Sequence, residues 1–189
     1  MAGVIDTSEF RKGLKIEVDG EPYEIIDFQH VKPGKGGAFV RTKLKNIRTG
    51  AVIDRTYSAG ERVNDVRLER RALQFSYADG HLYHFMDQQT FDDIMLTDEL
   101  IGQDQLKYLK EGMECEGLVH NDRVITVELP SFVELTVTRT APGIRGDTAT
   151  GGTKPATLET GATVQVPLFI EEGQVIRVDR REDKYLTRV

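Results

Sequence analysis

Residues 31–45 decide how the N-terminal third of the chain is read, because they combine a turn with a strand. They are Val31-Lys32-Pro33-Gly34-Lys35-Gly36-Gly37-Ala38-Phe39-Val40-Arg41-Thr42-Lys43-Leu44-Lys45. From residue 39 onward, basic side chains alternate with apolar side chains or threonine, and this period of two is typical of a strand with one buried face. The six residues 32–37 include one proline and three glycines, so we expect a turn that leaves Lys35 exposed.

Charge is distributed unevenly along the chain. Residues 28–53 contain six Lys and Arg and no Asp or Glu, although the 189-residue chain has a formal net charge of -6. Residues 1–64 hold 11 Lys and Arg against 9 Asp and Glu, residues 65–128 hold 6 against 14, and residues 129–189 hold 8 against 8, giving net charges of +2, -8 and 0. Such a chain can present a cationic end to phosphate while its acidic middle faces basic protein or solvent.

Short alternating segments separated by turns indicate an all-β protein. The first set ends near residue 64, with strands expected at 14–18, 23–28, 39–47 and 51–57 and a hairpin turn at Asp19-Gly20. The second set comprises an aromatic hairpin of 73–77 and 82–86 with a turn at 78–80, a helix at 103–110 ended by Gly112, and strands at 114–118 and 123–129 joined through Asn121-Asp122. This order is typical of a five-stranded Greek-key barrel of the oligonucleotide-binding (OB) type.

The third set is expected to contain strands at 132–137, 163–166, 174–178 and 184–186. Residues 141–155, with four Gly and two Pro, are expected to form a loop that is functional or disordered. We therefore expect three consecutive small β modules, 1–64, 65–128 and 129–189, with almost no linker between them and hence a rigid, elongated body.

The sequence indicates a cytoplasmic protein with no membrane partner. No apolar run approaches the ~18 residues that span a bilayer, and residues 1–10 lack the apolar core of a signal peptide. The single cysteine, Cys115, lies between Glu114 and Glu116, where like charge disfavours its thiolate, so we expect a buried structural thiol.

The motifs of nucleotide, metal and acid–base sites are missing, and the sequence indicates no enzyme. A Walker-type loop needs a glycine six residues before its lysine, but that position is Gln29, and Gly36 follows Lys35 in place of Ser or Thr. The four histidines are scattered and no cysteine pair exists, so neither a metal nor another cofactor is expected. The neighbouring carboxylates at 92–93, 98–99 and 171–172 are interpreted as solvated surface.

Recognition of a phosphate-rich partner remains. Lysine and arginine on a strand contact backbone phosphates without reading base sequence, and Lys35 on a glycine-flanked turn has unusual steric freedom. A solvated turn that happens to carry a lysine explains the same residues.

Two stretches resemble bacterial elongation factor P. The first is residues 31–41, and the second is the C-terminal pattern Lys154-Pro155-Ala156, Gly161, Val164, Val166-Pro167, Ile170 and Gly173. The resemblance extends over the full chain, including its length, three β modules and charge polarity. It implies an SH3-like (KOW-like) barrel followed by two OB-fold barrels, together shaped somewhat like a tRNA.

The resemblance also implies a function. Members of this family bind the ribosome, on both subunits, between the exit site and the peptidyl-tRNA site, and relieve stalling at consecutive prolines. The loop lysine, Lys35 here, approaches the acceptor end of the peptidyl-tRNA and is extended in many members by a modifying enzyme that adds a β-lysyl or similar group. The RNA-binding residues expected on this basis are Lys32, Pro33, Gly34, Lys35, Gly36, Arg41, Lys43 and Lys45. We expect a monomer.

The third module carries one further expected site and one departure from the family pattern. Gly146-Asp147-Thr148 resembles the motif thought to lie near the small subunit and the exit-site codon. Near the C-terminus the family usually has Val-Asp-Thr-Arg and a turn glycine before Tyr, whereas this chain has Arg180 and Asp183, which leaves the geometry of that turn open.

Two alternatives remain open. One is a plain RNA-binding adaptor whose aromatic hairpin around Phe75 and Tyr83 stacks bases. The other is a paralogue of elongation factor P that has lost the modification of Lys35.

Overall fold

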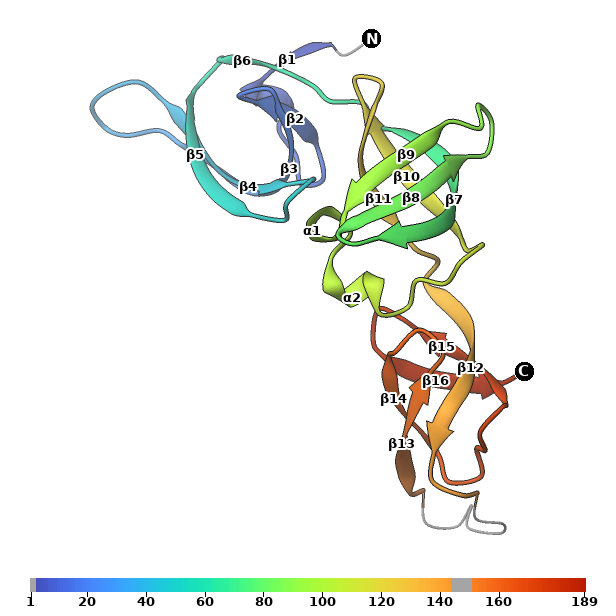
Figure 1. Ribbon diagram of the computed structural model, residues 1–189. Coiled ribbons are helices and arrows are strands. Elements are labelled where there is room, and N and C mark those ends of the chain that lie inside the picture. Colours follow the sequence, from blue (N-terminus) through green and yellow to red (C-terminus); the bar gives the residue numbers. More distant parts are fainter. Residues whose placement is uncertain (1–2, 144–150) are drawn as a thin grey trace. The chain divides into compact units, whose positions relative to one another are not determined.

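The computed structural model describes residues 3–143 and 151–189 and shows the predicted all-β fold (Figure 1). By backbone contacts the chain forms two compact units, residues 1–70 with 118–126 and residues 71–117 with 127–189. The predicted division into three modules at 64/65 and 128/129 stays a prediction. We use the terms first, second and third module below for the strand sets in these three ranges.

The first module contains a four-stranded antiparallel sheet and a short two-stranded one. The sheet has the order β2-β3-β4-β5, with β2 Lys15–Val18, β3 Glu21–Val31, β4 Phe39–Asn46 and β5 Val52–Ser58. The pair consists of β1 Val4–Asp6 and β6 Arg62–Asn64, and a 3-10 turn, Thr7–Glu9, follows β1. The predicted hairpin turn is confirmed, because Asp19 and Gly20 both have positive φ, as a tight two-residue hairpin requires.

Apolar side chains from all four strands of the larger sheet form the core of the first module. Val40 and Leu44 of β4 are fully buried against Ile16 and Ile25, and Phe10 packs edge to face on Tyr57 with 5.5 Å between ring centroids. The alternation predicted for β4 is therefore confirmed: its even positions are buried and Arg41, Lys43 and Lys45 are exposed.

The second module is a five-stranded sheet in the order β11-β10-β7-β8-β9. Its strands are β7 Glu69–Asp79, β8 Leu82–Asp87, β9 Asp93–Thr97, β10 Glu114–His120 and β11 Arg123–Glu128. Strand β9 was not predicted. The β10–β11 turn at Asn121-Asp122 is confirmed, with both residues at positive φ.

The helix predicted at 103–110 is wrong in extent. Two single-turn helices are present instead, α1 Asp98–Ile101 and α2 Gln103–Leu106, separated by Gly102 at φ +87. Beyond α2 the amides of Tyr108 and Leu109 bond to carbonyls three residues back. Both side chains are buried.

Cys115 is a buried thiol, as predicted, although the reason differs. Burial in β10 raises the pKa of Cys115 to about 12. The thiolate is therefore suppressed at neutral pH, which fits a structural role.

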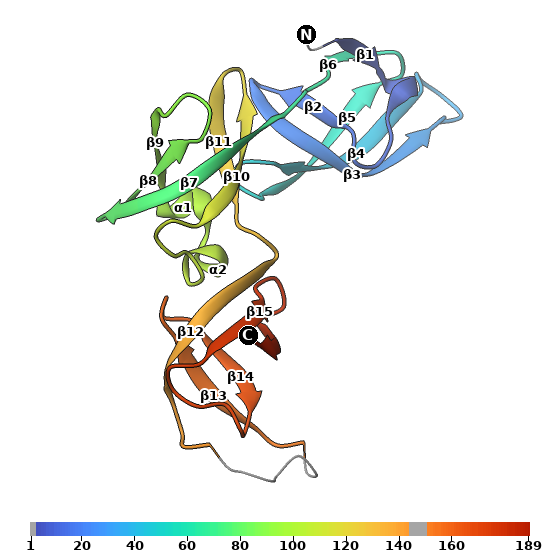
Figure 2. The same cartoon turned by 90° about the vertical axis from the view of Figure 1, so that its right-hand side faces the viewer.

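The third module is a closed barrel in the order β12-β13-β14-β16-β15, and Figure 2 shows its strands from the side. The strands are β12 Phe132–Thr140, β13 Thr153–Leu158, β14 Thr163–Pro167, β15 Val175–Asp179 and β16 Lys184–Arg188. A parallel pairing of β14 with β16 at Gln165 and Lys184 closes the barrel.

The loop predicted at 141–155 is wrong at its C-terminal end, because β13 begins at Thr153. The sequence pattern does not predict this strand, because one of its buried positions is occupied by a charged residue, Lys154. Its ammonium group donates hydrogen bonds to the carbonyl oxygens of Ala141 and, at 2.5 Å, of Ile170. A buried lysine held by carbonyls occupies a core position that sequence patterning assigns to solvent.

The two residues near the C-terminus that depart from the pattern implied by the resemblance lie at the boundary of the second and third modules, where the Arg180 guanidinium is 3.6 Å from a Glu128 carboxylate oxygen. Asp183 takes the left-handed turn conformation at φ +54, and its carboxylate accepts hydrogen bonds from the Tyr108 hydroxyl at 2.5 Å and the Lys107 ammonium at 2.8 Å. The buried guanidinium of Arg180 donates to the carbonyl oxygens of Leu129 and Pro130 at 2.6 to 3.1 Å. Both substitutions therefore provide hydrogen bonds, and the turn forms without glycine.

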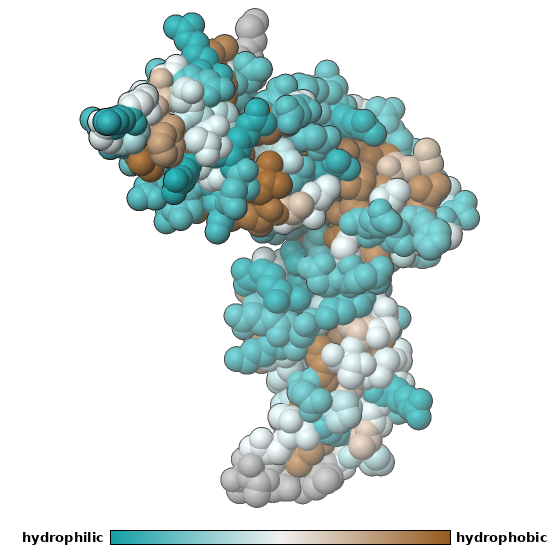
Figure 3. Space-filling model, turned by 90° about the vertical axis from the view of Figure 1, so that its left-hand side faces the viewer, coloured by the Kyte–Doolittle hydropathy of each residue, from teal (hydrophilic) through white to brown (hydrophobic). Residues whose placement is uncertain are grey.

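No helix among the described residues is long and apolar enough to cross a membrane. The face drawn in Figure 3 is largely hydrophilic, with apolar side chains gathered in separate patches.

Two buried tyrosines differ in one hydrogen bond and provide a matched test of core packing. Tyr57 is buried, and its hydroxyl has no partner among the described residues, whereas the Tyr108 hydroxyl is bonded to Asp183. We expect Tyr57→Phe to raise the free energy of unfolding by about 1 kcal/mol, because it removes an unsatisfied polar group. Tyr108→Phe should lower it by about 1 kcal/mol. Denaturant titration of both variants measures this, and a destabilising Tyr57→Phe would contradict it.

Candidate nucleic-acid interface

Lys35 lies in the loop that joins β3 to β4. The last paired residues of this hairpin are Val31 and Phe39, so residues 32–38 extend beyond the sheet. Lys32 and Lys35 are exposed. An ideal Cβ placed on Gly34, Gly36 or Gly37 would meet no atom within 4 Å, so this loop has open space around it. The loop can therefore enter a narrow site, and Lys35 has room to carry an added group.

Glycine is required at one loop position by backbone conformation. Gly36 has a φ of +101, in the region that L side chains rarely adopt, whereas Gly34 and Gly37 have no such φ. Gly36 therefore sets the direction in which the loop turns after Lys35.

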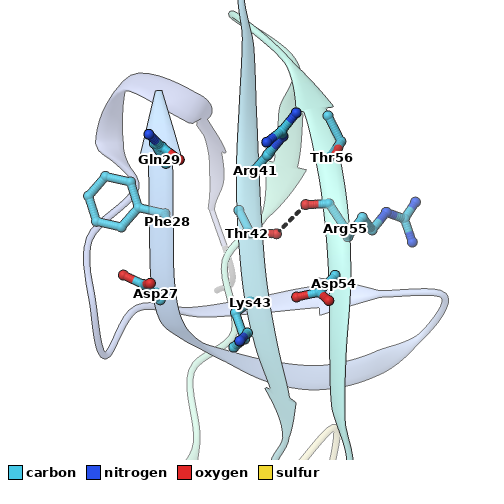
Figure 4. A pocket seen from close by; sticks show the side chains of 9 residues that line it. All are labelled: Asp27, Phe28, Gln29, Arg41, Thr42, Lys43, Asp54, Arg55 and Thr56. Atoms are coloured by element: carbon cyan, nitrogen blue, oxygen red, sulfur yellow. Dashed lines mark hydrogen bonds between the residues drawn. The ribbon is translucent and has the colours of Figure 1, made fainter. Parts of the chain in front are cut away.

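The exposed face of β4 carries Arg41, Lys43 and Lys45 at every second residue. Below this face, the Thr42 hydroxyl donates a 2.7 Å hydrogen bond to the Arg55 carbonyl on β5 (Figure 4). A shallow groove of about 380 Å³ runs across β3, β4 and β5 at this level. Nine residues line it, namely Asp27, Phe28, Gln29, Arg41, Thr42, Lys43, Asp54, Arg55 and Thr56.

The neighbouring strands partly neutralise this row of cations. Lys43 lies between Asp27 of β3 and Asp54 of β5 in the register of the sheet, and Lys45 lies beside Glu24. Arg41, by contrast, lies between Gln29 and Thr56. The uncompensated positive charge is therefore concentrated at the loop end of the hairpin, on Arg41, Lys32 and Lys35. Reading β4 alone could not show this, because the carboxylates come from other strands.

Aromatic rings lie at the same end of the hairpin, and the sequence reading did not single them out. The Arg41 guanidinium lies 5.4 Å from the centre of the Phe39 ring, within cation–π range. Phe28 and His30 of β3 meet edge to face at 5.7 Å, and His30 is exposed. Of these rings only Phe39 shares a face with Arg41, because Phe28 and His30 are registered with Thr42 and Val40 on the other face of the sheet.

Comparison with known proteins assigns the chain to a family. A family model described as the elongation factor P KOW-like domain matches residues 6–63, one described as the elongation factor P OB domain matches 68–127, and one for the elongation factor P C-terminal domain matches 133–188. The chain belongs to the elongation factor P family.

Curated relatives and solved structures agree with this assignment. Elongation factor P of Moorella thermoacetica is 57% identical over 98% of this chain and 100% of its own length. The protein of the same name from Pelotomaculum thermopropionicum is 54% identical over 98% of this chain and 100% of its own length. Among solved structures, a eukaryotic translation initiation factor 5A from Methanococcus jannaschii is similar, with a TM-score of 0.55 and 25% identity over 68% of this chain and 92% of that one. The all-β fold with a KOW-like module and OB modules, predicted from the resemblance, is thereby confirmed.

The structure brings some of the predicted site residues together. Residues 32–36 and Arg41 lie at one end of the β3–β4 hairpin, while Lys43 and Lys45 lie further along β4. The predicted third-module site, Gly146-Asp147-Thr148, lies outside the described residues. The roles of all these residues stay predictions.

The alternative in which Phe75 and Tyr83 stack bases is not supported by the geometry. Phe75 is 5% exposed and packs in the core of the second module against Tyr83 and Phe85, with ring centroids 5.9 and 5.4 Å away. Alternation along β7 places Phe75 on the inner face, so this ring cannot serve as an open platform.

The loop conformation can be tested with two glycines. We expect Gly36→Ala to cost about 1–2 kcal/mol at its positive φ, and an exposed loop relieves such strain by changing course. The variant should therefore lose translation-factor activity while its thermal unfolding is nearly unchanged. Gly37→Ala, which has the same open surroundings, is the matched control. Equal activities of Gly36→Ala and Gly37→Ala would contradict the requirement for glycine at position 36.

The compensation of charge on β4 can be tested by comparing two exposed cations. We expect Arg41→Ala to weaken ribosome binding and to reduce its salt dependence by about one unit of slope, because one phosphate contact is lost. Lys43→Ala should change the ribosome affinity and its salt dependence less, since Asp27 and Asp54 flank Lys43. Ribosome affinities of both variants, measured over a range of salt concentrations, test this prediction. A larger loss for Lys43→Ala than for Arg41→Ala would refute the charge assignment.

Proposed function

We propose that this member of the elongation factor P family acts in the cytoplasm as a monomeric, non-enzymatic translation factor. It binds both ribosomal subunits between the peptidyl and exit sites and stimulates peptide-bond formation at consecutive prolines. Lys35, extended by a β-lysyl or similar group that a modifying enzyme adds, contacts the acceptor end of the peptidyl-tRNA. Residues 146–148 contact the exit-site codon.

The observation that carries this proposal is the exposure of Lys35 on an open, glycine-rich loop. The nearby uncompensated cations, Lys32 and Arg41, suit a phosphate backbone. An added amine-bearing group would extend the reach of Lys35 and increase its charge.

The mechanism follows from positioning. Proline is a hindered nucleophile and stiffens the nascent chain, so the reacting groups rarely reach a productive arrangement. A cation that holds the acceptor end of the tRNA lowers the entropic part of the barrier without taking part in the chemistry. This role needs a well-placed charge and no catalytic acid or base.

The test is removal of the loop amine. We expect Lys35→Ala to leave folding intact and to abolish the stimulation of Pro-Pro bond synthesis by purified ribosomes. Lys35→Arg keeps the charge but cannot carry a lysine-specific group, so it separates charge from modification. Lys12→Ala is the matched control, because Lys12 is an exposed lysine of the same module paired with Asp27 at 3.4 Å.

Undiminished stimulation by Lys35→Ala would reject the proposal. Intact mass of the protein purified from its own host distinguishes a modified factor from an unmodified paralogue, because only the former exceeds the sequence mass.

A further inference from the structure

The exposed face of β7, β8 and β9 in the second module has no role in the site described above. Figure 1 shows these three strands side by side. In their register, Tyr77, His84 and Met95 form one row across the sheet, and Asp79, Leu82 and Thr97 form the next row on the same face. This face is opposite to the one that buries Phe75, Phe85 and Leu96.

Large apolar side chains are exposed on this face and at its end. Tyr77 is 50% exposed, Leu82 39%, Met95 57% and Phe91, in the β8–β9 turn, 71%. Single exposed apolar residues are ordinary, but four on one face and its adjoining turn indicate an interaction surface. We call Tyr77, Leu82, Phe91 and Met95 the apolar face.

The apolar face is held in place by defined contacts. The Tyr77 ring stacks on the buried His84 ring, with centroids 4.2 Å apart and 10° between planes, and His84 Nδ1 lies 3.0 Å from an Asp93 carboxylate oxygen. The rings are therefore fixed before any partner arrives, which reduces the entropy lost on binding.

Phe91 is exposed by a strained backbone. It has a φ of +60, which is rare for a bulky residue, and its amide donates to the Asp87 carbonyl at 2.8 Å. The Asp87 carboxylate accepts the amides of Gln89 and Thr90, and these bonds lower the pKa of Asp87. Strain that directs an aromatic ring into solvent indicates a functional constraint.

The charge around the apolar face is predominantly negative. Residues 72–106 contain seven Asp and Glu and no Lys or Arg. Strands β8 and β9 are the second and third of the OB fold, whose exposed face commonly binds oligonucleotides. Here carboxylates outnumber the cations of these strands, which are Arg70 and Arg71 at the start of β7, and Arg71 lies 3.9 Å from an Asp87 carboxylate oxygen. Such a surface suits phosphate poorly, and a second copy of the chain would bring like charge against like.

We propose that the apolar face binds an extended, Lys- and Arg-rich segment of a protein, whose apolar side chains contact Met95, Leu82 and Tyr77. Carboxylates around the face, such as Asp79, Asp92 and Glu99, pair with its cations. Strand β9 ends the order of the five-stranded sheet, so no further described strand of that sheet pairs with its outer edge, where an extended segment can add. That this partner is met on the ribosome rests on the proposed function, whereas the surface itself does not.

The first experiment needs no ribosome. The full-length protein is titrated with a synthetic peptide in which Lys and Arg alternate with Leu and Val, and the methyl signals of Met95, Met86 and Leu82 are followed by NMR. We expect these signals to shift, and Met95→Ser to weaken the peptide's affinity about tenfold, as for loss of a central apolar anchor. Leu186→Ser, at a similarly exposed apolar position on β16, is the matched control and should not weaken it.

Three results of this titration would overturn the proposal. They are an equal response to a peptide with Glu in place of Lys and Arg, a response of the same methyls to a uridine oligonucleotide, and unchanged affinity of Met95→Ser. The first would show an apolar surface without charge selectivity, and the second would show an RNA site.

The second experiment locates the partner. A photoreactive benzoylphenylalanine at position 91 is irradiated in the complex with purified ribosomes, with the same group at position 186 as control. We expect position 91 to cross-link to protein segments rich in Lys and Arg, and cross-links to RNA alone would contradict the proposal. If the peptide titration succeeds while the wild-type protein fails to stimulate Pro-Pro synthesis, the proposed function fails and the apolar face stands. If the wild-type protein stimulates Pro-Pro synthesis and the peptide titration fails, the proposed function stands and the proposal for the apolar face fails.

Discussion

Pairing of β3 with β4 is the constraint on which the functional end of this protein depends. Eight pairs between Tyr23–Val31 and Phe39–Asn46 hold the two strands in one register, with a bulge between Ile25 and Asp27. Val40 and Leu44 anchor that register by burial, because a slip of one residue would turn them to solvent and bring arginine and lysine into the core. The loop carrying Lys35 is therefore presented from a rigid base while remaining open itself. Precise placement of a mobile charge requires both properties.

Opposite charges are separated between modules, and each occupies a surface of different chemistry. In the first module, cations left uncompensated by neighbouring strands gather beside the Lys35 loop. In the second, carboxylates surround an exposed apolar face and no cation occurs from residue 72 to 106. A factor that must meet RNA with one part and protein with another gains selectivity from such separation, since each surface repels the other's partner. Net charge alone, at -6, conceals both surfaces.

Arg180 and Asp183, near the C-terminus, form hydrogen bonds at the boundary of the second and third modules. Arg180 and Asp183 satisfy carbonyls and a hydroxyl that would otherwise be buried without partners. Asp183 also adopts a left-handed turn for which glycine is usual, and the hydrogen bonds of its carboxylate offset the backbone strain. Lys154 acts similarly within the third barrel, where its ammonium group joins two segments through their carbonyls.

The sequence by itself determined the all-β class, most strands, the hairpin turns at 19–20 and 121–122, and the exposure of Lys35. These features depend on local alternation and on glycine or Asx residues at turns, which act over a few residues. It did not reveal β9, the break of the predicted helix at Gly102, or β13, which contains the buried Lys154. At these positions contacts between residues distant in sequence override local propensity. Nor could it show that Asp27 and Asp54 flank Lys43, or that Tyr77 and Met95 share a face. Only tertiary structure decided these, because strand pairing sets which charges and rings become neighbours, and a one-dimensional pattern does not contain that pairing.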